Sequence, residues 1–263
     1  MALDAAEQHR YGIHYYQDRL GCLRRLSRVG DEESDEARFG TMLHEWLKAY
    51  HTGTPLPELP TERLKQGCSP AELASRWASV YAPDVLGEVL LAEETLDGVL
   101  GVDGTVYPIR GTLDLVTRMD VATVCEFQRT TGVLLEPGVY LHDYKTKGRH
   151  LDTTIPELIN SRQATMYETL LEQRHPALVS EFRGVLFHLL YRYKDFKETT
   201  FRSIFVGRAY SEERRQLASL VRDATVRERE LGPDHCTPVR CYDWGRLCPL
   251  FDECPRHNLG GGR

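Results

Sequence analysis

The first third of the chain has the apolar spacing of helices. One such segment runs from about Glu7 to Arg28, and Ser34 could cap a second that reaches about Tyr50. Ser69-Pro70-Ala71-Glu72 then has the form of a capping box with proline at the first helical position. It predicts a helix that ends near Tyr81. We therefore expect a helical N-terminal part over residues 1–85.

From about residue 86 the apolar pattern changes to that of strands. Runs rich in Val, Leu, Tyr and Thr predict strands at Val89–Thr95, Thr105–Thr117, Ala122–Phe127 and Val139–Lys145. A helix from about Pro156 to Arg174, strands near Gly184–Tyr193 and Thr199–Val206, and a helix over Ser211–Glu230 follow. This order predicts an α/β fold of mixed type, in which a central mixed sheet and flanking helices share one core. We expect one domain over 1–263, with its sheet and helix in 86–210 and a C-terminal helix and cysteine-rich tail in 211–258.

The composition is that of an ordinary globular protein. The 263 residues are 41% hydrophobic and 27% charged, and the net charge of −6 excludes a surface that is basic throughout. Nucleic acid remains a candidate partner, because phosphate contacts depend on local basic patches. No apolar run is long enough to span a bilayer, and the polar stretch from Met1 to Arg10 does not look like a signal peptide. We expect a cytoplasmic protein without a membrane partner.

Two predicted strands carry charged residues that suit metal-dependent chemistry. Asp114 interrupts an apolar strand, and a buried carboxylate is costly unless it is paired or binds a metal. Asp143 and Lys145 lie two residues apart, so strand alternation puts both on one face and turns Tyr144 to the other. Carboxylates that bind Mg²⁺ or Mn²⁺, together with a lysine, suit phosphodiester hydrolysis. The alternative is a structural Asp–Lys ion pair on the sheet.

Residues on two predicted helices extend this set. Gly40 and His44 precede the strands, and Gln163 and Tyr167 share one helical face after them. Together with Gly111-x-x-Asp114 and Asp143-Tyr144-Lys145-Thr146, they resemble in kind and order the RecB-like branch of the PD-(D/E)XK nuclease superfamily. The resemblance spans about residues 39–167 and implies the restriction-endonuclease-like fold. It also implies that His44, Asp114, Asp143 and the carbonyl of Tyr144 ligate metal, that Lys145 is catalytic, and that Gln163 and Tyr167 support catalysis.

One feature departs from that family pattern. The separation of 29 positions between Asp114 and Asp143 is longer than this branch leads us to expect. Glu126-Phe127-Gln128 lies within the gap and could compete as the active strand. We favour Asp143 because its strand supplies Lys145, and we expect an inserted hairpin between about Val121 and Pro137.

The C-terminal tail contains cysteines that are spaced closely enough to bind one metal centre. Cys241, Cys248 and Cys254 lie close together, and Cys22 is a plausible fourth ligand, for which Cys236 could substitute. Four thiolates fit a [4Fe–4S] cluster or tetrahedral zinc. In relatives such as CRISPR adaptation exonucleases, AddB-type nucleases and phage exonucleases, one cysteine before the core and three after it hold an iron–sulfur cluster, and this resemblance favours iron. We expect the other two cysteines, Cys68 and Cys125, to be core residues.

The sequence therefore predicts a metal-dependent DNA exonuclease. Arg24, Arg25, Lys147 and Arg149 are candidate phosphate contacts. A preference for single-stranded ends, and a setting in phage, recombination or CRISPR-related DNA processing with a protein partner, follow from the family analogy alone. The alternative is a catalytically silent module that binds DNA and is stabilised by the cluster. Such a protein should lack Asp114, Asp143 or Lys145, and this chain retains all three.

Overall fold

A computed structural model describes residues 35–63, 67–147, 162–192, 201–231, 242–243 and 246–247. The chain forms two compact units. The larger unit comprises Glu33–Leu96 and Thr112–Tyr210, and the smaller comprises Met1–Glu32, Asp97–Gly111 and Ser211–Arg263. Among the described residues, no helix is both long and apolar enough to cross a membrane. The helix expected from Glu7 to Arg28 lies outside the described residues.

A mixed five-stranded sheet has the order β1-β2-β3-β4-β5. Its strands are β1 (Glu88–Val102), β2 (Thr105–Met119), β3 (Gly138–Lys147), β4 (Phe182–Tyr191) and β5 (Phe201–Gly207). The central strand β3 pairs antiparallel with β2 and parallel with β4, and β4 pairs antiparallel with β5. Because β3 and β4 are parallel, the chain must cross over between them, and α8 (Arg162–Arg174) lies in that crossover. The predicted mixed α/β fold is confirmed.

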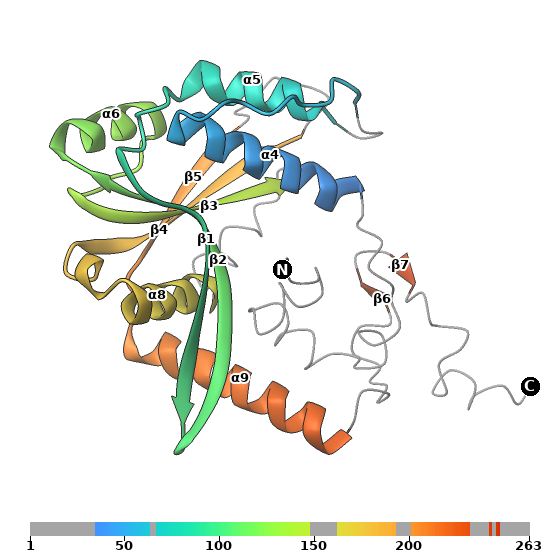
Figure 1. Cartoon of the computed structure of the whole chain (residues 1–263), viewed down its shortest axis with the longest axis vertical. Coiled ribbons are helices and arrows are strands. Elements are labelled where there is room, and N and C mark those ends of the chain that lie inside the picture. Colours follow the sequence, from blue (N-terminus) through green and yellow to red (C-terminus); the bar gives the residue numbers. More distant parts are fainter. Residues whose placement is uncertain are drawn as a thin grey trace, which may run out of the picture. The chain divides into compact units, whose positions relative to one another are not determined.

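Helices cover both faces of the sheet within the larger unit. Figure 1 shows α4 (Asp35–Thr52), α5 (Pro70–Val80) and α6 (Val121–Thr131) on one side of the strands and α8 on the other. A single 3₁₀ turn, Pro176–Leu178, follows α8. The first side holds the main apolar core, which brings side chains of α4, α5 and α6 against Tyr140, Tyr144 and Leu186 of the sheet. The opposite side of β3 is left for α8, and this is the side that receives Asp143.

Helix α5 begins where the sequence predicts. Ser69 Oγ accepts a hydrogen bond from the Glu72 backbone N–H at 3.1 Å, and Glu72 Oε2 accepts one from the Ser69 N–H at 2.9 Å. This reciprocal pair satisfies two amide groups that the first helical turn would otherwise leave without partners. The helix buries Leu73, Ala74 and Trp77 along one face. The predicted capping box is therefore confirmed.

The strand predicted at Ala122–Phe127 is wrong, and so is the inserted hairpin. These residues lie in helix α6. Asp120 caps its N-terminus by accepting from Thr123 N–H at 2.8 Å, and Gly132, in the left-handed region at φ 73°, ends it. The β-branched residues of this segment suggested a strand, but Val124 and Phe127 are buried at helical spacing. Cys125, expected in the core, is exposed on this helix.

A buried polar chain crosses four strands beneath α5. Thr117 Oγ1 lies 2.8 Å from His142 Nε2, His142 Nδ1 lies 2.9 Å from His188 Nε2, and His188 Nδ1 lies 2.9 Å from Ser203 Oγ. Each of these groups is therefore hydrogen-bonded despite its burial. The His188 ring also stacks on the Tyr144 ring at a centroid distance of 5.3 Å. The core between the sheet and α5 is thus stabilised by hydrogen bonds as well as by apolar packing.

A third buried histidine, His51, is held in its neutral form. Its Nδ1–H donates to Pro83 O at 2.9 Å, and its Nε2 accepts from Trp77 Nε1–H at 3.1 Å. A proton on Nε2 would face the indole N–H, so the charged ring cannot keep both hydrogen bonds. Burial lowers the pKa of His51 to about 4. Between about pH 6.5 and pH 4, His51 therefore stays neutral in the folded protein but binds a proton in the unfolded chain.

We expect His51 to make the fold sensitive to acid. Above the ordinary pKa of about 6.5 both states are neutral and His51 has no effect. Below it the unfolded state binds a proton first, so the free energy of unfolding falls by up to about 1.4 kcal/mol per pH unit until about pH 4. Urea unfolding at pH 7.5 and pH 5 should show the wild type losing about 2 kcal/mol more than His51→Gln. Equal losses in the two proteins would contradict this assignment.

The smaller unit contains the far end of the β1–β2 hairpin. Asp103 and Gly104, with φ of 50° and 76°, form its two-residue turn. Within this unit Asp103 Oδ2 accepts from Arg222 Nη1 at 3.0 Å, so the turn is tied to α9 (Ser211–Leu231). The short strands β6 (Tyr242–Asp243) and β7 (Arg246–Leu247) pair antiparallel.

Candidate active site

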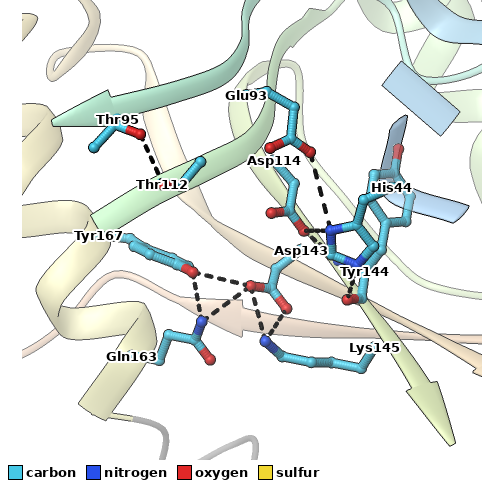
Figure 2. A network of polar contacts seen from close by, with 10 residues as sticks. All are labelled: His44, Glu93, Thr95, Thr112, Asp114, Asp143, Tyr144, Lys145, Gln163 and Tyr167. Carbon is cyan, nitrogen blue, oxygen red and sulfur yellow. Dashed lines mark hydrogen bonds and ion pairs between the residues drawn. The ribbon is translucent and has the colours of Figure 1, made fainter. Parts of the chain in front are cut away.

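Asp143 is the centre of the polar cluster on the α8 side of the sheet. The residue is 1% exposed on the central strand. Lys145 Nζ lies 3.1 Å from its Oδ1 and 2.8 Å from its Oδ2. From α8, Gln163 Nε2 donates to Oδ1 at 3.2 Å and Tyr167 O–H donates to it at 3.3 Å (Figure 2). The structure thus brings three predicted site residues, Lys145, Gln163 and Tyr167, onto the carboxylate of a fourth, Asp143.

Asp114 and His44 meet at the backbone of Tyr144. Asp114 Oδ2 accepts from the Tyr144 N–H at 2.8 Å, and His44 Nε2–H donates to the Tyr144 carbonyl at 2.9 Å. The other His44 nitrogen, Nδ1, lies 3.5 Å from Asp114 Oδ2. The Tyr144 side chain points the other way, into the core against Trp77. Strand alternation therefore separates the phenol of Tyr144 from its neighbours Asp143 and Lys145, as the sequence predicts.

Glu93 is a member of the cluster that the sequence analysis missed. It lies on β1, and its Oε1 is 3.9 Å from His44 Nδ1. Its φ of 51° is in the left-handed region, which is strained for a residue with a side chain. Such an irregularity in a strand can redirect a side chain, and Figure 2 shows Glu93 beside Asp114 and His44. Two adjacent acids, Glu93 and Glu94, were a sequence signal, but alternation alone cannot say which one faces the site.

Burial and mutual charge shift the pKa values of these groups. Burial lowers the pKa of His44, but Asp114 chiefly, with Asp143 and Glu93, outweighs burial and raises it to about 9. Burial, with the charge of Asp114, raises the pKa of Glu93 to about 7. Burial also raises the pKa of Asp143, despite Lys145. It opposes ionisation of Asp114 as well, but there the charges of His44 and Lys145 prevail and lower the pKa.

The donor atoms fit a hard divalent cation. One ligand atom each from His44, Glu93 and Asp114 lie within 4.8 Å of one another. Asp143 adds a buried carboxylate oxygen, Oδ2, whose partner within the described part of the chain is the Lys145 ammonium at 2.8 Å, so this oxygen has room for a further ligand. Carboxylate oxygens with one imidazole suit Mg²⁺ or Mn²⁺ better than soft metals. When all are charged, the carboxylates of Glu93, Asp114 and Asp143 exceed the positive charges of His44 and Lys145 by one. A divalent cation would offset this negative charge.

The structure clarifies some of the remaining predictions and leaves others outside its described part. Glu126, the competitor of Asp143, is exposed on α6 and pairs with Arg129. Cys68 is buried, as expected. Lys147 ends β3 and is partly exposed. Outside the described residues lie the proposed cluster ligands and three of the proposed phosphate contacts: Cys22, Cys236, Cys241, Cys248, Cys254, Arg24, Arg25 and Arg149.

The chain is similar to one known protein family and to several solved structures. The sequence profile of the PD-(D/E)XK nuclease superfamily matches residues 12–255. No curated protein matches the chain. Among solved structures, the protein named SSO0001 is similar at 13% identity and a TM-score of 0.45, over 94% of this chain and 87% of that one. A protein from Eubacterium rectale, described as a candidate exonuclease, is similar at 14% identity and a TM-score of 0.47, over the whole of both chains.

The family match extends over most of the chain and includes every polar residue of the cluster around Asp143. The mixed sheet and its flanking helices are those expected of that family. The chain belongs to the PD-(D/E)XK nuclease superfamily.

Proposed function

We propose that the protein is a metal-dependent deoxyribonuclease that degrades DNA from its ends and prefers single strands. The observation that carries the nuclease proposal is the convergence of Asp143, Lys145 and Gln163 beside the acidic group of Glu93 and Asp114. The attack from the ends and the strand preference rest on the resemblance to RecB-like exonucleases.

The residues of the cluster divide into three groups by their task in this proposal. His44, Glu93, Asp114, Asp143 and the Tyr144 carbonyl would hold Mg²⁺ or Mn²⁺, which when bound would supply Lewis acidity at the phosphodiester. Lys145 orients the attacking water and stabilises charge on the phosphoryl oxygens. Gln163 and Tyr167 hold Asp143 in place through its Oδ1.

The nuclease assay uses labelled single-stranded and double-stranded DNA with Mg²⁺, with Mn²⁺ and with a chelator. We expect cleavage only with a divalent cation, because such a cation would offset the negative charge of the carboxylates and supply the Lewis acidity that the reaction needs. Release of mononucleotides from labelled ends, faster for single strands, is the expected product pattern. Circular DNA that is cleaved as fast as linear DNA would contradict the exonuclease proposal. Cleavage that persists in chelator would contradict the metal site.

We also propose that Cys22, Cys241, Cys248 and Cys254 hold a [4Fe–4S] cluster. The support is the set of four thiolates, one before the nuclease core and three after it, as in the resembling exonucleases. We expect protein purified without oxygen to be brown and to contain about four irons and four sulfides per chain. Cys248→Ser should lose this iron and lower thermal stability, because the cluster would join distant parts of the chain. Four-thiolate zinc without iron would contradict the cluster.

A further inference from the structure

Arg192 is a buried arginine without an acidic partner among the residues that the structure describes. It follows the last residue of β4, and its backbone N–H donates to the Lys147 carbonyl at 2.9 Å. It therefore lies at the carboxyl ends of the two parallel strands, just beyond the last ladder pair, Lys147 with Tyr191. The residue is only 9% exposed. Within the described part of the chain its side chain forms no ion pair, and its buried Nε has no hydrogen-bond partner.

The surroundings of this guanidinium are mostly apolar. Its central carbon lies 5.1 Å from the centre of the Phe39 ring on α4. Its charge also acts on the buried Cys68 thiol, although burial prevails and raises the pKa of that thiol. At Gly67 a Cβ atom would lie 2.3 Å from the Arg192 carbonyl oxygen, so only glycine allows the loop before α5 to approach this closely. The packing therefore holds Arg192 tightly without neutralising it.

Such an arrangement costs stability unless an anion completes it. A buried charge is expensive when unpaired, and the attraction of an aromatic ring offsets only part of that cost. Arginine binds phosphate through a planar fork of N–H donors and keeps its charge at any physiological pH. The unpaired guanidinium thus suits a phosphate that arrives from outside the protein.

We propose that Arg192 binds a backbone phosphate of the DNA strand near the cleaved bond, on the α4 side of the sheet, where it lies over Phe39. The Arg192 N–H donates to the carbonyl of Lys147, two residues beyond Lys145 on β3, about 7 Å along the strand. Phe39, under Arg192, and His44, in the candidate site, both lie on α4, so this phosphate position borders the candidate active site. This inference rests on the proposed nuclease function and adds a substrate-binding residue that the family motifs do not include.

The test compares wild type with Arg192→Met, which keeps an unbranched apolar stem but removes the guanidinium and its charge. Binding of fluorescein-labelled oligothymidylate is followed by anisotropy over a series of salt concentrations, with Ca²⁺ in place of Mg²⁺. We expect Arg192→Met to bind about 10-fold more weakly and the slope of log affinity against log salt to become shallower by about 0.7, as for one lost phosphate contact. Its melting temperature should equal or exceed that of wild type, because an unpaired buried charge is gone.

Two further variants make the comparison specific. Arg192→Lys keeps the charge and should keep most of the salt slope while losing part of the affinity. Arg129→Met removes an exposed arginine from α6 that pairs with Glu126, and it should change neither quantity.

The outcomes separate this inference from the proposed function. If wild type and Arg192→Met bind DNA equally, the inference is overturned and the nuclease proposal stands. A large fall in melting temperature with unchanged affinity also overturns it, because Arg192 then serves the fold. If wild type neither binds nor cleaves DNA, the nuclease proposal fails. In that case inorganic phosphate that raises the melting temperature of wild type but not of Arg192→Met still supports an anion site, and the absence of that difference overturns it.

Discussion

Lys145→Met is expected to lower the rate constant of DNA cleavage by about 100- to 1000-fold, the usual cost of removing one group that stabilises developing charge. Lys145 Nζ lies 2.8 Å from Asp143 Oδ2, and its side chain is one-quarter exposed, so it can face both the metal ligands and a phosphate. Methionine keeps most of the aliphatic stem and removes only the charge. Single-turnover cleavage of end-labelled DNA at saturating Mg²⁺ measures this effect directly.

Lys147→Met is the matched control for that experiment. Lys147 lies on the same strand two residues further on, where we expect it to contact DNA rather than the reacting phosphate. Its replacement should weaken DNA binding and leave the single-turnover rate at saturating enzyme nearly unchanged.

Asp114→Asn should instead reduce Mn²⁺ binding, measured by calorimetry, together with cleavage. Wild-type cleavage by both Lys145→Met and Asp114→Asn would refute the catalytic assignment.

Trp77→Ala is expected to destabilise the fold by about 3–5 kcal/mol, the range for removing a large buried aromatic side chain. Trp77 is fully buried. Its ring stacks on Tyr81 at 4.1 Å and meets the edges of Phe201, His188 and Tyr144 at 5.3 to 5.6 Å. The change would leave a cavity among these rings and take away the donor to His51. Such a loss is a large fraction of the 5–15 kcal/mol typical of a folded domain, and urea unfolding will measure it.

Trp77→Phe separates the packing of this side chain from its hydrogen bond. Phenylalanine keeps most ring contacts but leaves the buried His51 Nε2 without its donor, which should cost about 1–3 kcal/mol. Val121→Ala, at an exposed position on α6, should change stability by less than about 0.5 kcal/mol. If Trp77→Ala were no more destabilising than Val121→Ala, the core would not depend on this residue.

Local signals in the sequence were enough where one short segment determines the structure. Ser69 and Glu72 cap α5 because both partners lie within one helical turn. Alternation along β3 places Asp143 and Lys145 together and Tyr144 apart, because successive side chains of a strand point to opposite faces. The β-branched residues of 121–131 favour a strand, but Asp120 and Gly132 cap this segment as a helix. The strand prediction is wrong because it takes account of β propensity alone.

The candidate site residues and their order, from His44 through Asp114, Asp143 and Lys145 to Gln163, are predicted from the sequence alone. Which further side chains lie beside them follows from the folded structure. Glu93 reaches the cluster because a positive φ on β1 turns it toward His44. The parallel pairing of β3 with β4 puts the backbone of Arg192 next to that of Lys147, and the packing of the described core buries its Nε without a hydrogen-bond partner there. Motifs record local spacing, but proximity between strands and the cost of burying a charge arise only when distant segments pack together.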